Sequence, residues 1–442
     1  MRRKWYWMAG FTLYFLLQNP ICLMAEDPSL QDLVDQTPKN GILHLQNKTY
    51  NGNVVITKPI TVKGRSRTSI KGNGTGNVIL LKKTADGTRL ESLRISHSSQ
   101  NRNSEEEYSA IKVLSDRNVL KNLKISDSFH GIYLSSSDDN ELSQVQITGI
   151  GGGEIAGQGN GVQLIRSHRN QLKDTVIRDS RDGIYFSYSN DNVVKDVDIS
   201  HTRYGLHYMY SDNNHFFHNR FHQNIGGAAI MNSKRIELIG NEFSYQQGSR
   251  SFGLMLQASD ENNVKDNHFY HNQRGLYIDL SQKNRIISND FHQNRVGVEL
   301  WASSSNQVFS LNRFFRNILP VITIGGRAKN KWSEGHKGNE WGDTFALVDL
   351  NEDKIGDIPV QYQSSLAKLM EDQELVYLFL PSPSIKIFEK INQFLHRQET
   401  VFKDPYPLLS EQQGGFQAGW FLLILFFIML GMIYVQRRRK VR

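Results

Sequence analysis

Two methionines and one histidine are the residues whose types and spacing first suggest chemistry. Met209 and Met231 are separated by 22 residues, and His207 lies two positions before Met209. Thioether and imidazole ligands together suit Cu(I), and loose thioether ligation favours transfer of the ion over its storage. Methionine also fills gaps in apolar cores and at contact surfaces, so a packing role stays open. We expect a transient Cu(I) site at His207, Met209 and Met231, with Met255 as a further ligand.

A second group of candidate ligands lies in the acidic segment DLNEDKIGD. Its alternating carboxylates and amide resemble the start of a calcium-binding loop. The pattern departs from such a loop because Lys354 replaces the usual glycine and Val360 stands where a glutamate is expected. A loop stabilised by Asx turns is the alternative. The candidate calcium ligands are Asp349, Asn351, Asp353 and Asp357.

Cysteine chemistry is excluded from the exported part of the chain. The only cysteine, Cys22, lies in the N-terminal leader, so we expect no disulfide and no thiolate ligand for zinc or an iron–sulfur cluster. Any soft-metal site must therefore use methionine and histidine. Three further histidines alternate with phenylalanines and are expected to face solvent or lie at a turn. They are His215, His218 and His222.

A repeat must position these residues. A unit of glycine, apolar, variable and apolar residue recurs with spacings of 30, 22, 22, 22, 26, 22 and 22 residues. The two longer spacings are expected where loops of eight and four residues interrupt regular turns. A weaker copy begins at Ala110. The glycines of the clear copies are Gly131, Gly161, Gly183, Gly205, Gly227, Gly253, Gly275 and Gly297.

Short strands with period-two alternation and Asn/Gly turns predict an all-β chain: a right-handed parallel β-helix, or solenoid. Twenty-two residues is close to one turn of such a helix, whereas a propeller blade needs about twice as many. Asparagines nine residues after the repeat glycines are expected to stack from turn to turn and bond main-chain groups. They are Asn140, Asn170, Asn192, Asn214, Asn284 and Asn306.

The alternation also predicts which side chains face outward. Positions one and three after each glycine should fill the bore, and positions two and four should form an outer strip. Only Asp279 and Glu299 are acidic on that strip and nothing basic accompanies them, which argues against a polysaccharide lyase or hydrolase. The strip is rich in tyrosine and methionine. Besides the Cu(I) candidates, its expected binding residues are Tyr133, Tyr185, Tyr277 and Trp301.

The ends of the chain predict export and anchoring. The net charge of +8 equals three positive residues at the start plus five at the end, so the body is neutral and lacks a nucleic-acid footprint. The C-terminal segment contains an amphipathic helix with Ile385, Phe388, Ile391 and Leu395 on one face, either capping the last turn or docking onto a membrane partner. The predicted parts are a signal peptide (1–25), a cap and first coils (26–105), regular repeats (106–320), an extension (321–410), a transmembrane helix (416–435) and a cytoplasmic basic tail (436–442).

Several motifs together resemble the NosD family, periplasmic β-helix proteins of nitrous oxide reductase maturation. They are RDGIYFSYS (181–189), GLHYMYS (205–211), GNGVQL (159–164), GNEWGD with DLNEDKIGD, and DPYPLL (404–409), and the likeness covers roughly residues 30–409. The resemblance implies work with an ABC transporter membrane subunit and its ATPase, a copper chaperone, and nitrous oxide reductase. Asn232, where the family often has tyrosine, and the C-terminal anchor depart from the pattern.

We therefore predict a single-pass membrane protein whose body lies on the extracytoplasmic side and which is not an enzyme. It would deliver copper, or sulfur for a copper–sulfur centre, and a partner would hydrolyse ATP because the chain has no nucleotide motif. Two alternatives stay open. One is a carbohydrate-active β-helix enzyme, a lyase, hydrolase or epimerase acting on polysaccharide. The other is a structural surface protein.

Overall fold

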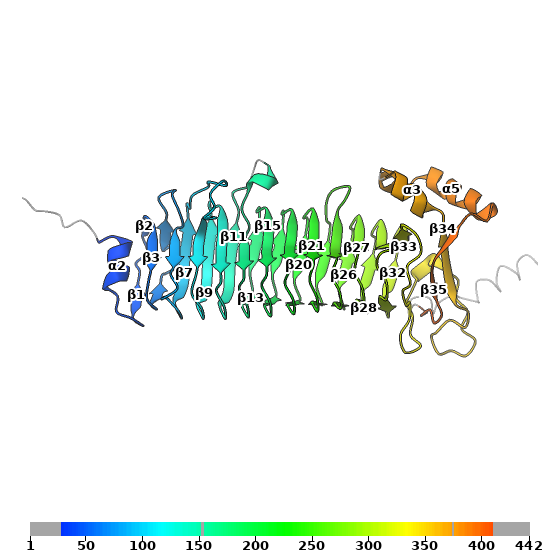
Figure 1. The fold of residues 1–442 in the computed structure, drawn as a ribbon, viewed down its shortest axis with the longest axis horizontal. Coiled ribbons are helices and arrows are strands. Elements are labelled where there is room, and N and C mark those ends of the chain that lie inside the picture. The colour runs from blue at the N-terminus through cyan, green and yellow to red at the C-terminus, as the bar shows by residue number, and fades with distance from the viewer. Residues whose placement is uncertain (1–27, 152–153, 374, 410–442) are drawn as a thin grey trace, which may run out of the picture.

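The computed structural model describes residues 28–151, 154–373 and 375–409. These residues form a right-handed parallel β-helix that runs the length of the molecule, with a small helix at one end and a mixed α/β extension at the other (Figure 1). The predicted signal peptide (1–25) and membrane span (416–435) lie outside the described residues. Within the described ranges, no helix is long and apolar enough to cross a bilayer.

One wall of the solenoid is a twelve-stranded parallel sheet with one strand from each coil. Its register confirms the predicted repeat, because residues 22 apart lie side by side: Tyr185 pairs with His207, and Met209 pairs with Met231. The strands in order are β3 (Val54–Ile56), β6 (Ile79–Leu81), β8 (Ser109–Val113), β10 (His130–Ser135), β12 (Val162–Ile165), β15 (Asp182–Ser187), β18 (Tyr204–Met209), β21 (Gly226–Met231), β24 (Phe252–Gln257), β27 (Arg274–Asp279), β30 (Val296–Trp301) and β33 (Leu319–Ile324).

A second, 21-stranded parallel sheet forms the remaining walls, usually with two short strands per coil. Its strands are β1 (Ile42–His44), β2 (Thr49–Asn51), β4 (Thr61–Lys63), β5 (Ser69–Lys71), β7 (Arg89–Ser96), β9 (Val119–Ser126), β11 (Glu141–Thr148), β13 (Gln171–Lys173), β14 (Val176–Arg178), β16 (Val193–Lys195), β17 (Asp198–Ser200), β19 (His215–Phe217), β20 (Arg220–His222), β22 (Glu237–Ile239), β23 (Glu242–Ser244), β25 (Asn263–Lys265), β26 (His268–Tyr270), β28 (Arg285–Ile287), β29 (Asp290–His292), β31 (Val308–Ser310) and β32 (Arg313–Phe315).

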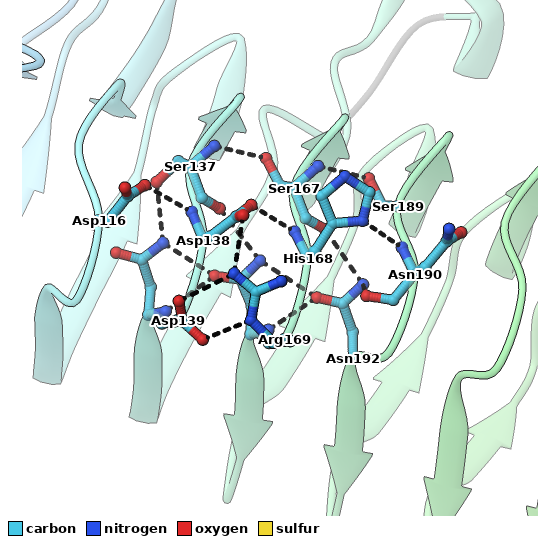
Figure 2. A network of polar contacts seen from close by, with 12 residues as sticks. Asp116, Ser137, Asp138, Asp139, Ser167, His168, Arg169, Ser189, Asn190 and Asn192 are labelled. Carbon is cyan, nitrogen blue, oxygen red and sulfur yellow. Dashed lines mark hydrogen bonds and ion pairs between the residues drawn. The ribbon is translucent and has the colours of Figure 1, made fainter.

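Buried asparagines tie one coil to the next at the turns. The Oδ1 atom of Asn192 accepts hydrogen bonds from the main-chain N–H and the Nδ2 of Asn170, at 2.8 and 3.1 Å. Figure 2 shows this turn, where serines stack in the same way and Arg169 binds Asp139 of the preceding coil. The prediction that Asn306 belongs to this ladder is wrong. Its coil has one extra residue, which places Gln307 in the ladder, and Asn306 lies outside it with a positive φ of 60°.

Stacked aromatic rings fill the bore toward the C-terminal end. Consecutive phenylalanine rings lie 4.7–5.2 Å apart between centroids, within 12° of parallel, and Trp341 continues the stack at 4.6 Å. The ring of Phe402 then covers Trp341 at 4.2 Å and closes this end of the core. The stacked phenylalanines are Phe221, Phe243, Phe269, Phe291 and Phe314.

Both ends of the solenoid are covered. At the N-terminal end, Ser29 caps helix α2 (Leu30–Gln36), which buries Leu30 and Val34 against the first coils. At the other end, two antiparallel strands and three helices follow the last coil. They are β34 (Val360–Ser364), α3 (Leu366–Asp372), α4 (Val376–Phe379), α5 (Pro383–Phe394) and β35 (Glu399–Asp404), and short 3₁₀ helices occur at Ile155–Gly157 and Gly342–Thr344.

The predicted amphipathic helix is α5, which begins at Pro383 with Ser382 as its cap. Of the four residues predicted to lie on one apolar face of this helix, only two pack against protein. Ile385 and Phe388 pack against the extension, whereas Ile391 and Leu395 are 53% and 46% exposed. The buried face is rotated because α3 and α4, which the sequence analysis did not anticipate, pack beside the helix.

Candidate functional site on the outer face of the twelve-stranded sheet

The register of the twelve-stranded sheet gathers the Cu(I) candidates on one outer surface. Met209 of β18 lies opposite Met231 of β21, and His207 lies opposite Ala229 of β21, which in turn lies opposite Met255 of β24. Adjacent strands are about 4.8 Å apart, so Met209 and Met231 are neighbours, whereas His207 and Met255 are two coils apart. All four candidate side chains are half-buried.

A buried carboxylate holds His207 in place. Asp182 of β15 is 1% exposed, and its Oδ2 lies 2.9 Å from the Nδ1 of His207. Arg203 donates two further hydrogen bonds to the same carboxylate, at 2.9 and 2.6 Å. Burial alone would raise the pKa of Asp182, but the hydrogen bonds from His207 and Arg203 outweigh it and hold that pKa below its ordinary value.

The Nδ1 of His207 also lies 3.1 Å from the Nη2 of Arg203, which can only donate, so Asp182 and Arg203 favour opposite tautomers of the imidazole. When Nδ1 carries the proton that is donated to Asp182, the lone pair of Nε2 is free for a ligand, which is the usual arrangement of a metal-binding or proton-accepting histidine. The rings of Tyr185 and Tyr204 flank the imidazole at 4.9 and 5.4 Å between centroids. The guanidinium of Arg203 lies over Tyr204 at 4.6 Å.

The prediction that nothing basic accompanies the acidic residues of the strip is wrong. The Nε of Arg274 donates to Glu299 at 2.7 Å, and the hydroxyl of Tyr377 donates to the same carboxylate at 2.6 Å. Both Asp182 and Arg274 occupy the position just before a repeat glycine. Strict alternation would have assigned this residue to the bore. The glycine interrupts the alternation, since the Cβ position of Gly183 faces Ile199 of the core while Asp182 reaches His207 on the outer face.

A cavity of about 460 Å³ adjoins this second cluster. Met255, Tyr277 and Trp301 of the sheet form its floor, while Met370 of α3 and Tyr377 of α4 approach it from the extension. Two of the predicted binding residues, Tyr277 and Trp301, therefore share one cavity.

The other two tyrosines of the predicted strip lie elsewhere. Tyr185 contacts His207, whereas Tyr133 is only 8% exposed, lies under the ammonium of Lys112 at 5.0 Å, and is three coils from His207. Burial, followed by the nearby Glu107, raises the pKa of Tyr133 to about 12. The predicted strip is therefore divided into separate sites and is not one continuous surface.

The acidic segment adopts the geometry of the Asx-turn alternative. The carboxylate of Asp349 accepts from the main-chain N–H groups of Asp353 and Lys354 at 3.2 and 3.0 Å. The carboxylate of Asp353 accepts from Ile355 at 2.8 Å, and that of Asp357 accepts from Leu350 at 2.7 Å. Throughout the part of the chain that the structure describes, no three His, Cys, Asp or Glu side chains converge as a metal site. Calcium at this loop stays a prediction.

The three additional histidines do not join His207. They belong to the 21-stranded sheet and its turns, where His215 pairs with Glu237 at 2.8 Å and His222 lies 3.2 Å from Asp198. His215 and His222 therefore each have an acidic neighbour, on a different wall of the solenoid from His207. The ring of His218 lies beside Gly240, which has a positive φ of 66°. These contacts agree with the solvated, structural interpretation.

Two comparisons relate the sequence of this chain to NosD proteins, and a third relates its fold to a solved structure. Residues 149–345 match the family model described as "Periplasmic copper-binding protein (NosD)". The chain is 26% identical over 371 residues to the "Probable ABC transporter binding protein NosD" of Stutzerimonas stutzeri, which covers 80% of this chain and 83% of that protein. Among solved structures, the A-module of mannuronan C-5 epimerase AlgE6 from Azotobacter vinelandii superposes with a TM-score of 0.54 at 10% identity, over 66% of this chain and 90% of that one. At that identity the likeness concerns the fold alone.

Proposed function

We propose that this chain is a NosD-type protein that binds copper transiently outside the cytoplasm, as an accessory protein of an ABC transporter, during assembly of the copper centres of nitrous oxide reductase. The observation that carries the proposal is His207, fixed by buried Asp182, beside two methionines from adjacent coils. The family and its named relative supply the copper and transporter context, and the residues of this chain supply the site.

The ligand set suits Cu(I) as a cargo. One imidazole nitrogen and the thioethers of Met209 and Met231 are soft, neutral donors, and this combination disfavours Mg²⁺ and Ca²⁺. Methionine has three rotatable bonds, so two neighbouring thioethers can close on an ion and open again. Met255 lies one coil beyond Met231 and diagonally from it, in the cavity under the extension, where it could receive the ion next.

Location completes the proposal. The leader at residues 1–25 would export the body, and the uncharged segment 416–435 with its basic tail would hold it at the outer face of the membrane. Because the chain has no nucleotide motif, ATP would be hydrolysed by the partner transporter. Copper is the preferred cargo over sulfur because the candidate site offers a metal-binding donor set and no cysteine that could carry a persulfide.

A Cu(I) titration tests this function. The full chain in detergent is titrated against a colorimetric Cu(I) chelator, alongside the double variant Met209→Leu and Met231→Leu. We expect the variant to lose one equivalent or to bind at least about tenfold more weakly, because two of three soft donors are gone. Ile165→Leu is the control, since this residue occupies the equivalent position two coils before Met209 and its replacement removes no soft donor. Equal stoichiometry and affinity in both variants would contradict the copper site.

A carbohydrate-active enzyme is the second candidate, and one observation favours it. The pair Asp182–His207, with Arg203 beside it, could remove a proton next to a carboxylate while the arginine neutralises the charge. An assay with polyuronate substrates would detect an unsaturated or epimerised product by absorbance or proton NMR. The two functions separate cleanly, because His207→Gln should abolish such an activity and Met209→Leu with Met231→Leu should leave it intact.

A further inference from the structure

Helix α5 has two apolar faces, and only one of them is covered by protein. Ile385 and Phe388 pack against the extension. A second set on the same helix points outward, with 59%, 53%, 82% and 46% of each residue exposed, in chain order. The spacing of these residues places them on one side of the helix. We call this set the α5 stripe: Ile387, Ile391, Phe394 and Leu395.

The α5 stripe is a continuous surface. Its four side chains, with Lys390, line a shallow hollow of about 300 Å³. A single exposed leucine is ordinary, but a contiguous apolar patch on one helix marks a contact with another molecule or with lipid. The fold does not require the stripe, since α5 is already held by its buried face and by its capping residue Ser382.

The course of the chain indicates what covers the stripe. The N–H of Leu408 donates to the carbonyl of Asn339 at 2.9 Å, which ties this point of the chain to the end of the solenoid. Helix α5 lies at the same end of the molecule (Figure 1). Only six residues lie between Leu409 and Phe416, where the uncharged segment 416–435 begins. The seven steps from one Cα atom to the next span at most about 25 Å, so a bilayer that holds this segment must lie close to the extension.

Charge around the stripe favours an anionic lipid surface. Lys386 and Lys390 border the stripe, where their aliphatic stems can lie along it and their ammonium groups can reach phosphate. The acidic residue of this helix is turned inward: Glu389 accepts from Ser364 at 2.9 Å and from Gln398 at 2.7 Å. The outward rim of α5 is therefore basic.

We propose that the α5 stripe inserts into the outer surface of the lipid bilayer and sets the angle at which the solenoid stands on the membrane. This inference rests on the membrane anchorage proposed above. Four large apolar side chains leave water on insertion, and two lysines meet anionic head groups at the boundary. The stripe and the segment 416–435 would then form two attachment points, which restrict rotation of the body about the anchor.

Fluorophores placed on single cysteines test this contact in the full chain. The protein carries Cys22→Ser and is reconstituted in nanodiscs containing phosphatidylglycerol, with an environment-sensitive label at Phe394→Cys. The control label is at Leu280→Cys, a residue 60% exposed on the solenoid. We expect nitroxide-bearing lipids to quench the label at position 394 several-fold more than the control, and aqueous iodide to show the reverse order.

Each other outcome overturns the proposal. Equal access of iodide to both labels means that the stripe faces water. Protection from iodide without lipid quenching means that protein, such as a second copy, covers it. Anchorage is judged separately by whether the full chain stays with the membrane after alkaline washing, and copper binding by titration. The variant with serine at positions 387, 391 and 394 should stay anchored and bind Cu(I) normally, while a label at Leu395→Cys loses its lipid quenching.

Discussion

Asp182 places a carboxylate where an unpaired charge would strongly destabilise the fold. It is almost fully buried, yet three hydrogen bonds from His207 and Arg203 satisfy it. Removing one partner of such a cluster normally leaves an uncompensated buried charge. The cluster therefore acts as a rigid support that holds the imidazole of His207 in one position on the outer face that also carries Met209 and Met231.

Replacing Asp182 with asparagine should weaken Cu(I) binding without removing any ligand. Asparagine can turn its amide toward His207 and favour the wrong tautomer, and support residues of this kind typically contribute 10- to 100-fold to metal affinity. Competitive Cu(I) titration gives the affinity, and histidine ¹⁵N shifts report the tautomer. Asp279→Asn, on the same face but four coils from Asp182, is the control and should bind like wild type. An unchanged ¹⁵N pattern in Asp182→Asn would remove the positioning role.

His130 should make the fold sensitive to mild acid. Its Nδ1 accepts the N–H of Asn160 at 2.9 Å, and burial, followed by Arg181 and Lys112, lowers the pKa of His130 to about 4. The unfolded chain, with an ordinary histidine pKa of 6.5, binds more protons between these values. The free energy of unfolding should therefore fall as the pH drops from 6.5 to 4, by at most about 3 kcal/mol.

Urea unfolding of wild type and His130→Gln across this range measures that contribution as a difference. The variant should lose less stability on acidification. His268→Gln provides a control of opposite sign: the carboxylate of Asp290 accepts from the imidazole of His268 and raises its pKa, so its stabilisation is present at low pH and is lost as the pH rises through that pKa. Parallel curves for wild type and His130→Gln would contradict the assignment.

At this scale the positions of the candidate ligands relative to one another could be predicted from the sequence better than the residues that contact them. Met209, Met231 and His207 could be placed together because a 22-residue repeat dictates which side chains are neighbours. Arg203 could not, since it lies just before β18 and reaches Asp182 only through the conformation of a long side chain. The contact of Tyr377 with Glu299 could not be predicted either, because it joins residues 78 apart and Tyr377 lies outside the repeat.

Among the secondary-structure elements, the asparagine ladders explain how so many short strands stay in register. The Oδ1 of Asn241 accepts from the main chain and the side chain of Asn219, both at 2.9 Å, and its Nδ2 donates to the carbonyl of Phe216 at 2.9 Å. Asn219 and Asn241 are buried, so these bonds replace water that cannot enter. A strand of three residues is therefore held in register by the hydrogen bonds of the turns on either side of it.

Asn241→Ala should therefore destabilise the protein by about 3 kcal/mol, because it leaves buried main-chain and side-chain groups of two coils without partners. Urea unfolding monitored by circular dichroism gives the difference. Gln171→Ala, on an exposed position of β13, should change stability by less than about 0.5 kcal/mol. If both substitutions had the same small effect, the ladder would be a consequence of the stacking and not one of its causes.

The strands of the repeat could be predicted from the sequence because their apolar residues recur with period two and their turns recur every 22 residues. The extension could not. Helices α3 and α4 are short, with seven and four residues, and their apolar side chains serve contacts with β33 and with each other. Which face of α5 is buried depends on these neighbours, so helical periodicity alone assigned Ile391 to the wrong environment.

On the scale of the whole molecule, the solenoid is a column of equivalent layers between two unlike ends. The coil that carries His207 is five strands from the last strand of the sheet, about 24 Å along the axis. A body attached at its C-terminal end would hold the candidate copper site at a set height above the membrane. The coils before β15 do not lie between the candidate copper site and the C-terminal end. A layer can therefore be removed there to test whether each layer folds independently of the others without changing the height of the site.

Deleting residues 119–140 removes one layer of 22 residues from this region. Register pairs Leu120 with Leu142 and Ile132 with Val162, so after the deletion β7 meets β11 and β8 meets β12 with every core column kept. Because a solenoid is stabilised mainly by contacts between neighbours, we expect a folded protein with a modestly lower Tm and unchanged Cu(I) affinity. Circular dichroism and copper titration measure both. Deleting only residues 119–129, which is half a layer, provides the contrast. This deletion would place β10 in the column of β9, break the turn ladders and expose the core, so that variant should fail to fold. If both deletions were tolerated equally, the layer would not be the unit on which stability depends.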